Sequence, residues 1–135
     1  NKDVIDQYKD AESLADVELV AEAGSAGEAA IKDSELTCTA VGTQADALLE
    51  VASGSADGCV IDITMANAMT GEGTSYQDLA AGISLTSEEY GVGFRKDSDM
   101  AEQVNKIMDE LIKDGTLDEI AAKYDLTANL VSNQS

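Results

Sequence analysis

The sequence contains no histidine, no tryptophan and no proline. Without histidine the chain lacks the base of Ser-His-Asp and Cys-His catalytic sites and the usual ligand of zinc. Basic residues are also scarce, because 8 Lys and Arg stand against 27 Asp and Glu and give a formal net charge of −19. Such an excess of acid repels phosphate backbones and anionic membranes. We therefore predict no nucleic-acid partner, no cofactor, no metal site and a solvated acidic surface.

Long apolar runs are missing as well. No run approaches the roughly 20 residues that a membrane-spanning helix needs. Residues 1–10, NKDVIDQYKD, are charged and lack the apolar segment of a signal peptide. We expect that any targeting segment was removed or lies outside this sequence.

The two cysteines, Cys38 and Cys59, do not form a CxxC pair, and each lies in a short apolar stretch. Free cysteine is among the most buried residue types, which favours two free thiols that pack as small apolar side chains. A single disulfide is the alternative if the chain is secreted.

Strand-like and helix-like segments alternate along the chain. The apolar runs 17–24, 37–41 and 58–63 predict strands, as does the alternating segment 90–96, while 79–85 predicts a further strand or an extended segment. This alternation predicts an α/β fold with a mainly parallel sheet flanked by helices.

Helix-start signals follow the first strands. Ser25 with Glu28 forms a capping box, and a helix that opens at Thr43 ends at Gly54. A second capping box is expected to begin a helix at Thr116. The helix expected over 98–113 has one apolar stripe, made of Met100, Val104, Ile107, Met108, Leu111 and Ile112. The face expected to be buried on the helix after Thr43 is Ala45, Leu48, Leu49 and Ala52, and on the last helix Leu117, Ile120, Ala121 and Tyr124.

Two places could hold a ligand, because ligands of open α/β sheets bind beyond the carboxyl ends of strands. The first is the strand-to-helix turn Glu22–Gly27, where small residues and free helix N–H groups favour an anion. A tight capped turn without a ligand explains the same residues. The second is Asp62, which either caps the following helix or accepts a ligand ammonium group. Together, an anion site and a cation site form a receptor for an α-amino acid.

Several segments carry a resemblance to a known family. They are VELVAEAGSAGE, QADALLEVASGSADGCVIDITMANAM, EEYGVGFRKDSDM and KIMDELIKDGTLDEIAAKYDL. They resemble the family-3 solute-binding proteins of polar amino-acid ABC importers, a periplasmic-binding-protein-like family of type II. The match follows the family order over nearly the whole chain. The motifs Gly54-Ser55-Ala56-Asp57 through Asp62 and DGTLDEIAAKY are its most specific parts.

The resemblance implies two α/β lobes joined by two hinge strands, with the ligand between them. It assigns residues 1–87 to ligand-binding lobe 2, 88–96 to the returning hinge strand and 97–135 to the C-terminal helices of lobe 1. The N-terminal part of lobe 1 has no counterpart, so the sequence is expected to be truncated. In the family that part carries an arginine for the ligand carboxylate and aromatic residues that clamp the side chain. Arg95 does not match that arginine.

Carried over by position, the resemblance assigns ligand-binding roles to six residues: Glu22, Gly24, Ser25, Ala26, Gly27 and Asp62. The turn of Ser25, Ala26 and Gly27 is expected to bind the ligand carboxylate, and Asp62 its α-ammonium. Glu22 matches a position that lines the ligand side chain. Family members often have threonine where Ser25 and Ala26 stand, so the resemblance implies that a hydroxyl contact is lost at Ala26.

The implied function is the capture of an amino acid for delivery to ABC permease subunits, with no catalytic residues. The implied location is extracellular, on a cell-surface lipoprotein or in a periplasm. The truncated chain is expected to bind weakly by itself, and to self-associate or exchange its tail. The alternatives are a dehydratase-like enzyme on the same scaffold, with Glu22 as its acid, and the sensory domain of a receptor.

Overall fold

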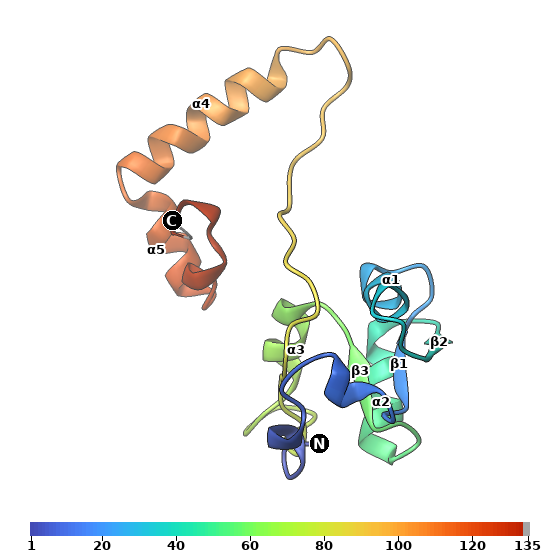
Figure 1. The fold of residues 1–135 in the computed structure, drawn as a ribbon. Coiled ribbons are helices and arrows are strands. Elements are labelled where there is room, and N and C mark those ends of the chain that lie inside the picture. Colours follow the sequence, from blue (N-terminus) through green and yellow to red (C-terminus); the bar gives the residue numbers. More distant parts are fainter. Residues whose placement is uncertain (134–135) are drawn as a thin grey trace. The chain divides into compact units, whose positions relative to one another are not determined.

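The computed structural model describes residues 1–133, and the chain divides into two compact units, Asn1–Ser87 and Glu88–Ser135. Unit 1 contains a three-stranded parallel sheet with its helices, and unit 2 contains helices α4 and α5 (Figure 1). The predicted α/β class with a parallel sheet flanked by helices is confirmed. The boundary between the units follows residue 87. That the units are lobes of a binding protein stays a prediction, and residues 134 and 135 of its last segment lie outside the described residues.

The elements of unit 1 are β1 Leu19–Glu22, α1 Ala26–Asp33, β2 Cys38–Val41, α2 Gln44–Ser53, β3 Gly58–Val60 and α3 Ile63–Met69. Unit 2 contains α4 Met100–Lys113 and α5 Thr116–Lys123. Short 3-10 turns lie at Ile5–Gln7, Glu12–Leu14, Thr127–Asn129 and Val131–Asn133.

The strand order is β2-β1-β3, so the chain moves from the central strand to one outer strand and then crosses to the other outer strand. Parallel crossovers are right-handed in nearly all proteins. Two right-handed crossovers that run in opposite directions place their helices on opposite faces of the sheet. The strand order therefore reverses between β1 and β3, which is where ligands bind in sheets of this kind.

The core lies on both faces of β1. Leu19 and Ala21 pack with Ile31 of α1 on one face, and Val20 packs with Ala47 of α2 on the other. All three β1 residues are at most 4% exposed. This burial explains why β1 is a continuous apolar run rather than an alternating one. The first face is completed by Leu14, from the second N-terminal turn.

The Gly54-Ser55-Ala56-Asp57 motif aligns the beginnings of β1 and β3. Gly54 ends α2 with a φ of 78°, in the left-handed region that favours glycine. Ala56 is buried against the α2 side of the sheet. The Asp57 carboxylate accepts a 3.0 Å hydrogen bond from the Glu18 N–H, and the Asp57 N–H donates to the Glu18 carbonyl at 3.0 Å. The acid of this motif therefore has a structural role.

Segment 79–85, expected as a strand or an extended segment, and segment 90–96, expected as a strand, form no strand among the described residues. A segment becomes part of a sheet only where a neighbouring strand supplies hydrogen-bond partners, and none pairs with either segment here. The first of them still contributes to the core, because Leu79 is buried and Ile83 and Leu85 pack on the α1 side of the sheet.

The buried face of α2 differs from the one expected. Ala47 and Leu48 are buried and Val51 packs beside them, whereas Leu49 is 57% exposed. The expected and the observed face both match a helical period of 3.6 residues, and alanines do not distinguish them. Gln44 lies on the observed face, since its side chain accepts the backbone N–H of Asp62 after β3.

The second expected capping box is wrong. Helix α5 begins at Thr116 without a side-chain cap of its own, and the Asp114 carboxylate instead accepts the Thr116 N–H at 2.9 Å. Hydrogen bonds from the Thr116 side chain and backbone hold the pKa of Asp114 below its ordinary value.

On the face of α5 that was expected to be buried, Ala121 is buried, but Ile120 and Tyr124 are 49% and 62% exposed. The stripe of α4 is present in sequence, yet none of its residues is buried.

Cys38 and Cys59 are both free, and they pack on opposite faces of the sheet. They also lie on the two outer strands, paired in register with Leu19 and Val20 of β1. Two strand spacings amount to roughly 9–10 Å, well beyond the about 7 Å limit for Cα atoms joined by a disulfide. The free-thiol interpretation is therefore confirmed for this fold.

We predict that the native chain reacts slowly with iodoacetamide at pH 8. Burial raises the pKa of the Cys59 thiol to about 11, and desolvation also raises that of Cys38. Because the thiolate is the nucleophile, Cys59 in a Cys38→Ser variant should alkylate roughly a hundredfold more slowly than in urea. Its rate should rise with pH toward 11. Equal native and unfolded rates, measured by intact mass, would contradict this burial.

Candidate functional site

Three helices begin at one edge of the sheet. Each strand of a parallel sheet ends at the same edge, and here α1, α2 and α3 follow β1, β2 and β3 after short turns (Figure 1). Their N-caps are Ser25, Thr43 and Asp62, and each side chain accepts a hydrogen bond from the first turn of its helix. The predicted site residues belong to the first and third of these turns. The second turn was not predicted to take part.

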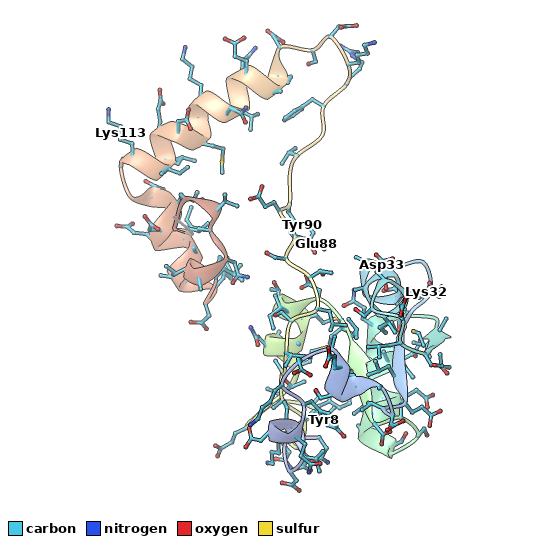
Figure 2. All side chains as sticks on the ribbon, in the orientation of Figure 1. Tyr8, Lys32, Asp33, Glu88, Tyr90 and Lys113 are labelled. Carbon is cyan, nitrogen blue, oxygen red and sulfur yellow. The ribbon has the colours of Figure 1, made fainter. Side chains whose placement is uncertain are left out.

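The turn after β1 is a capping box, as predicted. The Ser25 hydroxyl accepts the Glu28 N–H at 3.1 Å, and the Glu28 carboxylate accepts the Gly24 N–H at 2.8 Å. Lys32, labelled in Figure 2, donates to the same carboxylate at 2.6 Å. This bond is the main reason that the pKa of Glu28 is lowered and that of Lys32 raised. Gly24 has a φ of 75°, so a glycine suits this turn.

The backbone N–H groups of Ala26 and Gly27 have no acceptor among residues 1–133. They belong to the first turn of α1, where the helix dipole adds positive potential. Two unoccupied donors beside such a dipole are suited to a carboxylate.

Gly27 brings this turn against the end of β3. A Cβ atom at Gly27 would lie 2.7 Å from the Val60 carbonyl oxygen and 3.2 Å from its carbon. Only a residue without a side chain permits such an approach. Because Val60 ends β3 two positions before Asp62, the first turn of α1 and the turn that holds Asp62 meet at the reversal in strand order.

Asp62 caps α3, which was one of the two interpretations of this residue. Its Oδ1 atom accepts the N–H groups of Thr64 and Met65 at 2.9 and 3.2 Å. The residue is half-buried. Binding of a ligand ammonium by the same carboxylate stays a prediction.

Gln44 is the residue that sequence reasoning missed at this edge. Its Oε1 atom accepts the backbone N–H of Asp62 at 3.1 Å, which links the start of α2 to the turn after β3. The helix-start signal at Thr43 predicted that Gln44 begins a helix. It could not predict the hydrogen bond to Asp62, because the Gln44 side chain crosses from the second turn to the third.

Glu22, the last residue of β1, lies on the α2 side of the sheet. It pairs in register with Val41, whose side chain packs on that side, as does Ile61 beyond the end of β3. Glu22 is half-buried, and its carboxylate has no hydrogen-bond or ion-pair partner within the described chain.

The surface hollow of unit 1 lies away from these turns. A shallow, open hollow of unit 1 lies between Tyr8, labelled in Figure 2, and the segment 81–83, and it contains none of the predicted site residues.

In residues 1–133, no group of three or more acidic or cysteine side chains could hold a metal ion. No helix in this range is long and apolar enough to cross a membrane.

No protein-family model matches this chain, and no solved structure matches it significantly.

We predict that Gly27→Ala lowers the free energy of unfolding by about 1–2 kcal/mol. The added Cβ meets the Val60 carbonyl and forces α1 away from β3, a cost of roughly 1–3 kcal/mol that the better helix propensity of alanine offsets by up to about 1 kcal/mol. Gly91→Ala is the matched control, because a Cβ there has nothing within 4 Å. Urea unfolding followed by circular dichroism measures both variants. A Gly27→Ala midpoint equal to that of the control would show that the contact is not tight.

Proposed function

We propose that this chain is the second lobe and C-terminal tail of the substrate-binding component of an amino-acid ABC importer. The observation that carries the proposal is the pair of unoccupied N–H donors at Ala26 and Gly27, in a turn that meets the end of β3 two residues before Asp62, at the reversal in strand order. The donors would hold the ligand carboxylate and Asp62 the α-ammonium. Such a component binds its ligand without chemical change.

The net charge supports a zwitterionic ligand over a simple anion. At a formal −19, the chain repels an anion at long range, but it exerts little net force on a ligand whose two charges cancel. The helix terminus and Asp62 then act at short range, each on the opposite charge of the ligand.

The proposal extends to the whole protein. A further part of lobe 1 would close over the ligand, and the closed form would deliver it to permease subunits from a cell-surface lipoprotein or in a periplasm. The chain alone supplies only half of the contacts, so its ligand stays partly hydrated. Binding by the chain alone is therefore expected near millimolar concentration, about −4 kcal/mol. Self-association of the chain through the α4 stripe is part of the same proposal, and light scattering at several concentrations measures it.

We predict that millimolar L-alanine shifts the amide resonances of Gly24, Gly27 and Asp62 in a ¹⁵N-labelled chain. N-acetyl-alanine has no ammonium group and should shift them much less. Asp62→Asn should abolish the difference between the two ligands, because it removes the negative charge. Asparagine caps helices as well as aspartate does, so this variant should unfold like the native chain.

Asp62→Ala is the matched control for the cap. It should lower the free energy of unfolding by about 1 kcal/mol, since the Thr64 and Met65 N–H groups lose their acceptor. If L-alanine and N-acetyl-alanine shift the same resonances equally in the native chain, Asp62 is a cap alone and the proposed ammonium site is wrong.

A further inference from the structure

Positive charge is missing from a long stretch of the chain. No Lys or Arg occurs between Lys32 and Arg95, although Asp and Glu recur throughout that stretch. Lys2 pairs with Asp78 at 3.4 Å and Lys32 with Glu28 at 2.6 Å. Because 27 acids stand against 8 bases, most carboxylates have no base to pair with in any arrangement. No charged side chain of residues 1–133 is buried, so the carboxylates remain in contact with water.

Acids also occupy backbone positions that usually belong to glycine. Among residues 1–133, every non-glycine residue with a positive φ is acidic: Glu35 at 58°, Asp97 at 63° and Asp125 at 58°. This left-handed conformation favours glycine and asparagine, and aspartate tolerates it better than glutamate does. The backbone alone therefore gives no reason for an acid at Glu35.

Two of these three acids follow the ends of helices. Glu35 comes after α1, where the Leu36 N–H donates to the Ile31 carbonyl at 3.1 Å, and Asp125 has the same place after α5. Glycine has this place after α2, at Gly54. The C-terminus of a helix carries partial negative charge, so it repels a carboxylate. Local stability does not account for acids at these ends.

The core supplies little to oppose the repulsion among the acids. Half of the buried apolar side chains in residues 1–133 are alanines, which remove much less apolar area from water than leucine does. Among residues 88–132, Ala121 alone is buried. Protein stability is a small difference between large terms, so uncompensated charge repulsion has a large effect on it.

We propose that the folded state of this chain depends on dissolved cations, which take the place of the basic side chains that the chain lacks. The cations form a diffuse layer over the acidic surface and reduce the repulsion among its carboxylates. No single residue binds them. This dependence does not rest on the amino-acid site, since acids over the whole surface contribute to it.

The salt range follows from the spacing of acids that folding brings together. Like charges lie four residues apart at Asp46 and Glu50 of α2, and at Glu110 and Asp114 at the end of α4. The Cβ atoms of such pairs are about 5–6 Å apart while the helix is formed. The Debye length is about 8 Å at 0.15 M salt and about 3 Å at 1 M. Screening of these pairs therefore requires salt well above 0.15 M.

The test is thermal unfolding of the chain, residues 1–135, followed by circular dichroism between about 10 mM and about 1 M NaCl. The midpoint temperature should rise by roughly 5–10 °C over this range, since a modest gain in stability shifts a small domain by several degrees. Choline chloride at the same concentrations should give the same rise, because a diffuse layer does not select its cation.

Three exposed acids of unit 1 provide matched variants: Asp16, Asp33, which is labelled in Figure 2, and Glu72. The triple variant Asp16→Lys, Asp33→Lys, Glu72→Lys reverses three charges. It should unfold above the native chain in low salt, and its midpoint should rise less steeply with salt. The triple variant Asp16→Asn, Asp33→Asn, Glu72→Gln only removes the charges and should fall between the two.

Glu35 separates the effect of charge from that of the backbone. Glu35→Gln removes the charge alone, so it should raise the midpoint by roughly 2–5 °C in low salt and by little in about 1 M salt. Glu35→Gly also relieves the left-handed backbone, so it should raise the midpoint at both concentrations.

Each other outcome contradicts part of the proposal. Equal midpoints of the native chain in low and high salt would overturn the dependence on cations. An equally steep rise in the lysine variant would also overturn it, because salt would then act on apolar burial alone. A rise with Na⁺ but none with choline would show a specific cation site in place of the diffuse layer.

Discussion

The burial of β1 on both faces is the constraint on which the rest of unit 1 depends. Its three apolar residues can leave water only if one helix covers each face, and the strand order β2-β1-β3 achieves this with two short crossovers. The same order brings the ends of β1 and β3 together at one edge. The core and the candidate site are therefore two consequences of a single topology. A change that weakens the packing of the core also displaces the residues of the candidate site.

The polar groups at that edge are organised by the caps of the helices. Ser25 and Thr43 direct helix N–H groups toward their own oxygens, and Asp62 does so for α3. These bonds hold each of the three turns in one conformation. A binding site made of such turns loses little conformational freedom on binding, which favours affinity.

Local signals in the sequence predicted much of this arrangement. The capping box at Ser25 and the glycine at the end of α2 each depend on a few neighbouring residues, so they were correct. The box expected at Thr116 was wrong because Asp114, two residues earlier, competes for the same N–H. The Gln44–Asp62 bond, the register of Glu22 and the contact of Gly27 with Val60 are set by tertiary packing. None of these three has a sequence pattern of its own.

The pairing of Glu18 with Asp57 joins residues that are 39 positions apart. During synthesis, β1 leaves the ribosome long before its partner β3, and until then one of its edges has no strand to bind. The sheet of unit 1 cannot be completed until both crossovers have been synthesised, and contacts between residues distant in sequence slow folding. The nascent chain carries an exposed apolar strand through this interval, which is the state most open to aggregation and to chaperones.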